Sequence, residues 1–326
     1  MPSDMLLDAT PRKAFSAPAL CATTSVVVLT RNSEDHLADL LSSLAATAPP
    51  PHRVLFIDSR STDRTASMIA AAGYALEVID PNDFGHGRTR NLALDLCGDS
   101  SHVVFLTHDA LPVGPDWLLR LLSPFARPDV AVAFGRQLPR PGATIAERFA
   151  RIFNYPDRPE TTTEADVKRR GIKAVFCSNS FAAYDRAVLH GIGGFPEDLP
   201  MGEDMAATLR LLRAGYARAY CASACAIHSH DYTLRQEFGR YFDIGVLLDC
   251  DPALRDAQIA ASGEGRSILS AELRYARQQG GLPAMAGVLA RAASKLTGFQ
   301  LGRHYRLMPR TLCRTFSMHS YYWSRT

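Results

Sequence analysis

The stretch Val103-Val104-Phe105-Leu106-Thr107-His108-Asp109 joins a short apolar run to a single carboxylate. A run of this length, rich in β-branched and aromatic residues, is typical of a buried strand. In a parallel sheet, the residues that follow each strand lie at the carboxyl edge, where ligands bind. Asp109 is therefore predicted to be a metal-binding carboxylate at that edge.

Similar apolar runs recur along the first half of the chain, separated by segments with helical periodicity. One such segment carries Leu37, Leu40, Leu41 and Leu44, which share one face of a helix. The alternation predicts an α/β fold with a mostly parallel sheet flanked by helices. The expected strands are Ser25–Thr30, Val54–Asp58, Leu76–Ile79, Val103–Thr107 and Val130–Phe134.

The alternation stops after Pro139-Arg140-Pro141-Gly142, and an irregular region follows. Within and beyond it, the apolar patterns predict a strand near Ala174–Ala183, a helix over Asp204–Ala214 and a strand over Ala217–Ile227. From Thr233 onward the chain is expected to be mostly helical.

The composition excludes several classes of protein. With 326 residues, of which 47% are hydrophobic and 21% charged, the chain can bury one large core or two smaller ones. A net charge of +3 is too small to indicate nucleic-acid binding by itself. Seven cysteines without a CxxC pair predict reduced thiols in a cytosolic setting. No secretory signal or run of roughly 18 apolar residues is found.

The glycine-rich stretch Phe84-Gly85-His86-Gly87-Arg88-Thr89-Arg90-Asn91 tests for a dinucleotide fold. The fingerprint of that fold needs a third glycine where Arg90 stands. A nicotinamide-dependent enzyme is therefore not expected.

Four stretches in this order resemble the inverting glycosyltransferases of family 2, and within that family the bacterial rhamnosyltransferases. They are Phe84–Asn91, Leu106–Pro112, Phe134–Pro139 and His228–His230. The resemblance covers about residues 24–248 and implies a GT-A fold. It also implies transfer of a sugar from a nucleotide donor, most simply L-rhamnose from dTDP-L-rhamnose, to a polysaccharide or lipid-linked saccharide acceptor.

The resemblance also suggests how the chain is divided. Residues 1–23 are expected to be a mobile leader, residues 24–248 the GT-A domain, and residues 249–326 a basic helical C-terminal region. Within the domain, residues 24–139 would bind the nucleotide and residues 140–248 the acceptor.

By the resemblance, Asp58 accepts a hydrogen bond from the base of a uridine or thymidine nucleotide, while Gly87 and Arg90 lie near the diphosphate. An alternative is that Asp58 and Ser61 cap the helix that follows, and that the glycine-rich stretch is a surface turn. The nucleotide-binding positions implied are Thr30, Arg31, Asn32, Asp58, Ser61, Gly87, Arg90 and His108.

The family usually places two carboxylates around its metal ion, in the pattern DxD. This chain has Thr107-His108-Asp109 there, so the first carboxylate is missing. A divalent cation, Mg²⁺ or Mn²⁺, can take most of its ligands from water and the diphosphate. His228 is the expected additional ligand, with His230 as a weaker substitute, and an imidazole ligand favours Mn²⁺. The alternative for His228 is a hydrogen-bonded histidine at a strand end.

Inversion at the anomeric carbon requires a base that takes the proton of the acceptor hydroxyl. Asp204, in Gly202-Glu203-Asp204 at the start of a predicted helix, resembles the family's ED motif and is the candidate base. Glu203 would hold the acceptor or exchange roles with Asp204, and the alternative is an acidic pair that caps the helix. Residues expected to line the donor sugar or the acceptor are Ser178, Asn179 and Gly194.

The C-terminal region is strongly basic. From Leu273 onward there are nine Lys or Arg residues and no Asp or Glu, and the basic residues interleave with Phe299, Tyr305, Tyr321, Tyr322 and Trp323. This mixture suits an anionic membrane surface with aromatic rings at the headgroup level. The alternatives are a basic face packed on the catalytic domain, or a contact between copies.

These features predict a cytoplasmic enzyme of cell-envelope polysaccharide biosynthesis, peripheral at the inner face of the membrane, with no nucleic-acid partner. Two alternatives stay open: a transferase that uses another donor such as a UDP-hexose, and a catalytically silent protein that binds sugar nucleotides. A homo-oligomer is compatible with both.

Overall fold

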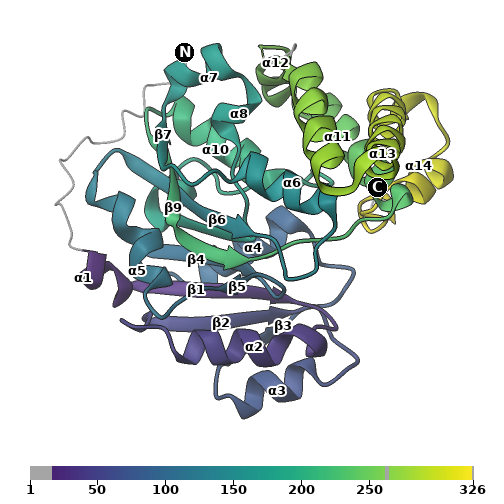
Figure 1. Ribbon diagram of the computed structural model, residues 1–326. Coiled ribbons are helices and arrows are strands. Elements are labelled where there is room, and N and C mark those ends of the chain that lie inside the picture. The colour runs from purple at the N-terminus through teal and green to yellow at the C-terminus, as the bar shows by residue number, and fades with distance from the viewer. Residues whose placement is uncertain (1–16, 261–263, 325–326) are drawn as a thin grey trace, which may run out of the picture.

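The computed structural model describes residues 17–260 and 264–324. Its centre is a nine-stranded mixed sheet in the order β3-β2-β1-β4-β8-β6-β9-β5, with β7 paired to β9 (Figure 1). The strands are β1 (Thr24–Thr30), β2 (Arg53–Asp58), β3 (Ala75–Val78), β4 (His102–Thr107), β5 (Leu111–Pro112), β6 (Val130–Leu138), β7 (Glu160–Thr162), β8 (Phe181–Asp185) and β9 (Ala217–Ile227).

The predicted α/β architecture is confirmed. Strands β3, β2, β1 and β4 are parallel neighbours, and each of the five strands expected in residues 25–134 is present within a few residues of its predicted ends. The second half of the sheet is mixed, because β8 is antiparallel to both β4 and β6. The first half supplies the open carboxyl edge at which the polar loops collect.

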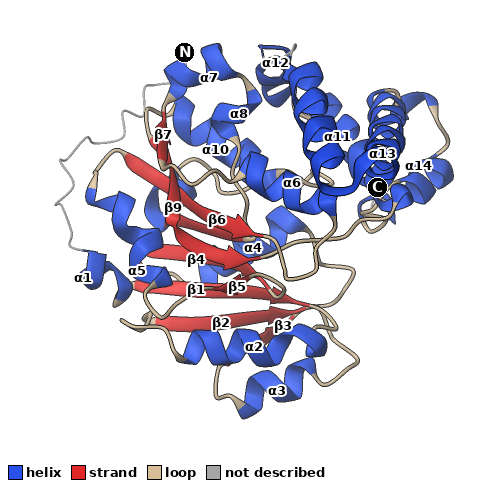
Figure 2. Cartoon of the chain, viewed as in Figure 1, coloured by secondary structure: helices blue, strands red, loops and turns tan. Residues whose placement is uncertain are grey.

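Helices cover both faces of the sheet (Figure 2). Side chains alternate along β1: Val26 and Val28 join one core with α2 and α5, while Val27 and Leu29 join a second core with α4 and α10. The helices of the domain are α2 (Glu34–Ala45), α3 (Thr65–Ala71), α4 (His86–Leu96), α5 (Trp117–Leu122), η1 (Ser123–Ala126), α6 (Ile145–Asn154), α7 (Glu164–Arg170), α8 (Ile172–Val175), α9 (Arg186–Gly191) and α10 (Glu203–Arg213).

The structure corrects the strand expected near Ala174–Ala183. Residues Ile172–Val175 form the short helix α8, and the strand begins only at Phe181. The apolar residues 174–177 are compatible with a buried helix or a buried strand, so periodicity could not separate the two, and the polar residues 178–180 lie between α8 and the strand.

Part of the segment expected to be a mobile leader, residues 1–23, is helical. Ala17–Cys21 form the helix α1, and Leu20 and Cys21 are buried in the core beside α5. The sequence pattern did not indicate this helix because its apolar run is short and follows residues with isolated charges. Residues 1–16 lie outside the described part.

The C-terminal helices form one lobe beside α6 (Figure 1). They are α11 (Leu234–Cys250), α12 (Pro252–Ala260), α13 (Glu264–Arg303), η2 (Tyr305–Leu307), α14 (Arg310–Phe316) and η3 (Tyr322–Ser324). The boundary expected between residues 248 and 249 falls inside α11. Helices α11 and α13 cross closely because glycines face backbone: a Cβ at Gly302 would lie 2.0 Å from the Phe242 carbonyl oxygen, and one at Gly298 would lie 2.3 Å from that of Phe238.

This packing changes the interpretation of the aromatic residues in the lobe. Trp323 is only 8% exposed and lies in a core with Phe242, Val246 and Cys313, against which Tyr305 and Tyr322 pack. These rings therefore stabilise the lobe, and Trp323 is too deeply buried to lie at a lipid headgroup level. In the described residues, no helix is long and apolar enough to cross a membrane.

Candidate active site

A carboxylate and two imidazoles meet at the end of β4. Asp109 Oδ1 lies 3.4 Å from His228 Nε2, and Asp109 Oδ2 lies 3.4 Å from His230 Nε2. The potential ligand atoms of all three residues fall within 4.8 Å of one another. The cause is strand pairing: Leu111 of β5 pairs with Ile227 of β9, which brings the residue two positions before Leu111 next to the residue after Ile227.

Gln137 on β6 orients the first of these imidazoles. Its Oε1 lies 2.9 Å from His228 Nδ1 and also accepts from Arg151, while its Nε2 donates to Ser178 Oγ. This network makes Oε1 an acceptor, so the proton of the imidazole belongs on Nδ1. The lone pair of His228 Nε2 then faces the Asp109 carboxylate.

The protonation of the cluster also favours a cation. Burial disfavours the charged form of Asp109, but the adjacent imidazole groups of His228, His230 and His108 outweigh it, so the pKa of Asp109 lies well below its ordinary value. Burial lowers the pKa of His230 to about 4, with a further contribution from His228, which leaves the ring neutral at pH 7.

These residues fit a divalent cation. One carboxylate oxygen and two imidazole nitrogens converge, and Gln137 fixes one imidazole from behind, as the outer partners of metal ligands commonly do. The sequence predicted Asp109 and His228 as ligands with His230 as a weaker substitute, and the structure brings all three residues together. The Nδ1 of His228 is hydrogen-bonded, as the alternative expected, while its Nε2 points at Asp109.

The acidic pair lies at the start of α10, where Gly202 adopts a left-handed conformation with φ of +78°. Glu203 Oε1 lies 2.9 Å from Arg90 Nη1, and both side chains are almost fully buried. The side-chain amide of Asn179 donates to Glu203 Oε1, and its backbone N–H donates to Asp204 Oδ2 at 3.1 Å.

The two carboxyl groups have opposite pKa shifts. Burial opposes the ionisation of Glu203, but the charges of Arg90 and His86 and the bond from Asn179 together lower its pKa. Burial raises the pKa of Asp204 to about 7, and the negative charge of Glu203 adds to this effect. Glu203 is therefore a fixed anion, whereas Asp204 can gain or lose a proton near neutral pH.

A continuous path of polar contacts joins the two clusters. It runs from Asp109 through His228 to Gln137, from Gln137 to Ser178, and from the adjacent Asn179 to Asp204. Residues 178 and 179 precede β8, which lies between β4 and β6 in the sheet. Gln137, which contacts the Asp109 cluster, and Asp204 thus bond to two neighbouring residues just before β8.

The loops after β1 and β2 form a third polar group, at the carboxyl edge of the parallel half. Asp58 is 1% exposed and accepts hydrogen bonds from Thr30 Oγ1 at 3.0 Å and from the backbone N–H of Ser61 at 2.7 Å, as well as from the Ser61 hydroxyl. Asn32 has a positive φ of 48° and its side chain accepts from the N–H of Thr62. The two loops are therefore tied into one rigid unit.

Asp58 does not cap the next helix. Helix α3 begins at Thr65, and the backbone N–H of Thr65 donates a hydrogen bond to Asp63 Oδ1. Of the other expected positions in this area, Arg31 is exposed, and the ring of His108 stacks on His36 with centroids 6.1 Å apart.

The glycine-rich stretch serves a packing role in the structure. A Cβ at Gly87 would lie 1.9 Å from the carbonyl oxygen of Pro196, and one at Gly194 would lie 2.5 Å from Asn91 Oδ1. Helix α4 therefore packs tightly on the loop that leads to Glu203. Arg90 points into this contact, where it pairs with Glu203.

Comparison with known proteins agrees with this site. The sequence model of Glycosyl transferase family 2 matches residues 25–193, more than half of the chain.

The chain belongs to glycosyl transferase family 2.

Two curated proteins are similar to this family 2 glycosyltransferase over most of their length. The O-antigen chain rhamnosyltransferase WbaN of Salmonella anatum is 42% identical over 84% of this chain and 87% of its own. The O-antigen chain rhamnosyltransferase RfbN of Salmonella typhimurium is 36% identical over 92% of this chain and 96% of its own. The resemblance to bacterial rhamnosyltransferases is thereby confirmed.

The fold is also that of a solved family of enzymes. The mannosyltransferase PcManGT of Pyrobaculum calidifontis, solved with GDP-Man and Mn²⁺, superposes with a TM-score of 0.56 at 19% identity, over 97% of this chain and 89% of its own. At that identity the likeness shows the fold, and it confirms the expected GT-A architecture.

Three parts of the glycosyltransferase site were not assigned from the sequence. Gln137 lies within Phe134–Pro139, one of the stretches that resemble the family, but no role was predicted for it. Arg90 was predicted to lie near the diphosphate, whereas in the structure it pairs with Glu203. The third is the C-terminal segment, whose Tyr321 donates to the carbonyl oxygen of Pro200 and whose His319 ring contacts His86. The only available signal was the position of Gln137 three residues after the predicted strand Val130–Phe134.

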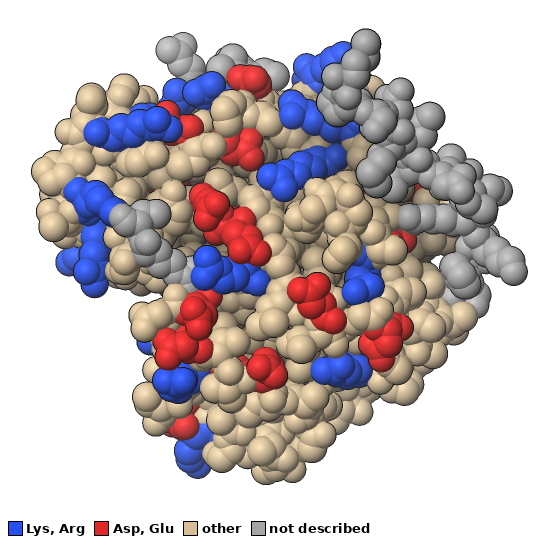
Figure 3. All heavy atoms as spheres, turned by 180° about the vertical axis from the view of Figure 1, so that it is seen from behind, with Lys and Arg blue, Asp and Glu red and all other residues tan. Residues whose placement is uncertain are grey.

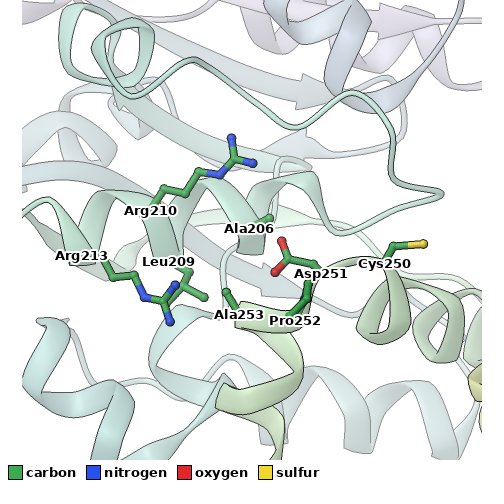
Figure 4. Close-up of a pocket in the computed structure, with 8 residues that line it drawn as sticks. All are labelled: Ala206, Leu209, Arg210, Arg213, Cys250, Asp251, Pro252 and Ala253. Atoms are coloured by element: carbon green, nitrogen blue, oxygen red, sulfur yellow. The ribbon is translucent and has the colours of Figure 1, made fainter. Parts of the chain in front are cut away.

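A hollow of about 430 Å³ lies elsewhere, between α10 and the start of α12. Figure 4 shows Arg210 and Arg213 on the α10 side and Asp251 on the other. None of the three polar groups of the site lines this hollow, and it opens beside the C-terminal half of α10 rather than at Glu203. The chemistry belongs to the polar groups around β8.

Proposed function

We propose that this glycosyltransferase moves L-rhamnose from dTDP-L-rhamnose, with inversion, to a hydroxyl group of a polysaccharide or lipid-linked saccharide of the cell envelope. The donor and acceptor are inferred from the two relatives named as O-antigen chain rhamnosyltransferases, which match almost the whole chain. The reaction would take place in the cytoplasm, at the inner face of the membrane.

The observation that carries the proposal is the polar path from Asp109 to Asp204. Inverting transfer needs two things at one anomeric carbon: stabilisation of the departing diphosphate and removal of a proton from the incoming hydroxyl. The path connects a cation-binding cluster to a carboxyl group whose pKa of about 7 suits a general base at neutral pH.

In this proposal, Asp204 takes the proton of the acceptor hydroxyl. Glu203 stays ionised beside Arg90 and raises the proton affinity of Asp204. Asn179 holds both carboxyl groups in place and, with Ser178, lines the donor sugar.

The nucleoside is placed at the edge formed by the loops after β1 and β2. An ionised carboxylate has about four acceptor positions, of which Thr30 and Ser61 occupy three at Asp58. The remaining position would accept the N3–H of thymine. Asn32, Arg31 and His108 would flank the ribose and the diphosphate.

Asp109, His228 and His230 would hold the divalent cation, and the two imidazoles favour Mn²⁺ over Mg²⁺. Bound there, the cation would neutralise charge that develops on the diphosphate leaving group. Gln137 keeps His228 in the tautomer that this requires.

A donor screen tests the proposal. Thermal shifts are measured with dTDP, UDP and GDP, with and without Mn²⁺, because a ligand stabilises only the folded state that binds it. Transfer is then assayed with dTDP-L-rhamnose and with UDP-hexoses. We expect dTDP to give the largest shift, Mn²⁺ to increase it, and dTDP-L-rhamnose to be the donor that turns over.

Each failure has a separate meaning. If UDP-hexoses were turned over and dTDP-L-rhamnose were not, the proposed donor would be wrong, but the protein would still be a glycosyltransferase. Nucleotide binding without any turnover, on a range of saccharide acceptors, would favour the catalytically silent alternative.

A further inference from the structure

Helix α13 presents an unusual outward face after its break at Gly281. Leu282, Leu289 and Leu296 are 76%, 52% and 61% exposed. They recur every seven residues; Ala286 and Ala293 fall between them, and Gln300 lies four residues after Leu296, all three also exposed. Side chains at these spacings form one stripe along a helix.

The stripe carries no charge. Every exposed residue from Gln278 to Gln300 is uncharged. The two basic residues in this span, Arg291 and Lys295, turn inward to Glu237 on α11, at 3.0 and 3.7 Å. A helix on the surface of a soluble domain ordinarily directs its charges outward, so this helix has the reverse arrangement.

Basic residues border the apolar stripe at both ends. Arg274 and Arg277 are exposed just before it, and Arg306 and Arg314 are exposed after it. Two more leucines in the same lobe, Leu307 and Leu312, are 84% and 38% exposed. No acidic residue occurs from Leu273 to the C-terminus.

On the face seen in Figure 3, Lys and Arg lie among Asp and Glu over much of the surface. The apolar stripe of α13 is bordered mainly by basic residues, of which Arg306 pairs with Asp249 of α11 at 2.7 Å.

We propose that the α13 stripe, Leu282 to Gln300, is the surface on which the protein docks to an anionic lipid bilayer. Charge decides between the two obvious occupants. Two copies that met through this face would bring arginines against arginines, which costs free energy, whereas anionic headgroups complement them. A helix with leucines on one face and basic residues beside them lies in the plane of the interface.

The biological purpose of this docking rests on the proposed function, because a lipid-linked acceptor would be presented at the membrane surface. Docking itself needs no donor, metal or turnover. It also replaces the aromatic contact expected from the sequence by a leucine contact.

Vesicle flotation of the full chain tests the docking surface. The vesicles are phosphatidylcholine alone and phosphatidylcholine with phosphatidylglycerol, each at low and high NaCl. The variant is Leu289→Glu with Leu296→Glu, and a milder version uses glutamine at both positions. The control is Ala71→Glu at the end of α3, an exposed apolar residue far from the lobe (Figure 1).

We expect the unaltered protein and the control to float with the phosphatidylglycerol vesicles, and less so in high salt. The glutamate variant should bind roughly tenfold more weakly or worse, because two leucines no longer enter the bilayer. All variants should transfer sugar equally to a soluble acceptor.

Three results would overturn the proposal: no flotation of the unaltered protein, equal flotation of the leucine variants, or a dimer in solution that the leucine variants dissociate. The last would assign the stripe to a second copy. Loss of flotation in the leucine variants of a protein without transferase activity would leave the docking surface standing while the proposed function failed.

Discussion

Replacing Asp204 with Asn should make the protein inactive and, at neutral pH, relatively more stable. The pKa of Asp204 is raised from 3.8 to about 7 in the folded protein. Between these two values the folded state keeps a proton that the unfolded state has lost, so stability falls as the pH rises. The cost of ionising this buried group above pH 7 is on the order of 4 kcal/mol.

Asparagine does not titrate, so the variant escapes this cost. It also loses one of the two acceptor oxygens that bind the N–H groups of Asn179 and Met205. This loss lowers the free energy of unfolding by an amount that does not depend on pH. The informative quantity is therefore the free energy of unfolding of the variant minus that of the unaltered protein. This difference should increase by about 4 kcal/mol from below pH 4 to above pH 7.

Urea unfolding at several pH values measures this difference, and a transfer assay runs in parallel. Transfer should fall by about 10²- to 10⁴-fold in the variant, since a general base contributes that much, while nucleotide binding persists. In the unaltered protein, kcat/KM should drop about tenfold for each pH unit below 7 as Asp204 becomes protonated. A pH-independent stability difference, or normal turnover, would refute the assignment of Asp204 as the base.

Three further changes probe the rest of the site. Arg90→Met should lower the free energy of unfolding by about 3 to 5 kcal/mol, because it leaves Glu203 buried without its partner, and adding Glu203→Gln should restore much of the loss in urea unfolding. Gln137→Leu should weaken Mn²⁺ binding, measured by calorimetry, by about 10- to 100-fold, since His228 loses the group that fixes its tautomer. Gly87→Ala should cost about 1 to 3 kcal/mol in thermal unfolding, because the new methyl group meets the Pro196 carbonyl oxygen.

Matched controls separate these effects from general damage. Arg127→Met removes an exposed ion pair with Asp129 and should cost less than about 1 kcal/mol. Gly191→Ala adds a methyl group where nothing lies within 4 Å. If Arg90→Met cost no more than Arg127→Met, the buried pair would not be holding Glu203. Unchanged Mn²⁺ affinity in Gln137→Leu would remove Gln137 from the metal site.

The sequence by itself determined the parallel half of the sheet and much of the site. Apolar runs such as Val103–Thr107 are local signals, since burial on both faces of a strand leaves its mark on consecutive residues. A polar residue directly after such a run, such as Asp109, must lie at the carboxyl edge. The helix that begins at Glu203-Asp204 was likewise predicted from its local pattern, while the role of the acidic pair came from the resemblance to the family.

Only the tertiary structure decided which distant residues meet and what surrounds them. The pairing of β5 with β9 carries both His228 and His230 to Asp109, and no local pattern announces that pairing. Burial beside Glu203 sets the pKa of Asp204, and the fold turns Arg90 inward to Glu203. Periodicity reports which face of an element is buried, whereas proton affinity and metal geometry depend on neighbours that are remote in the chain.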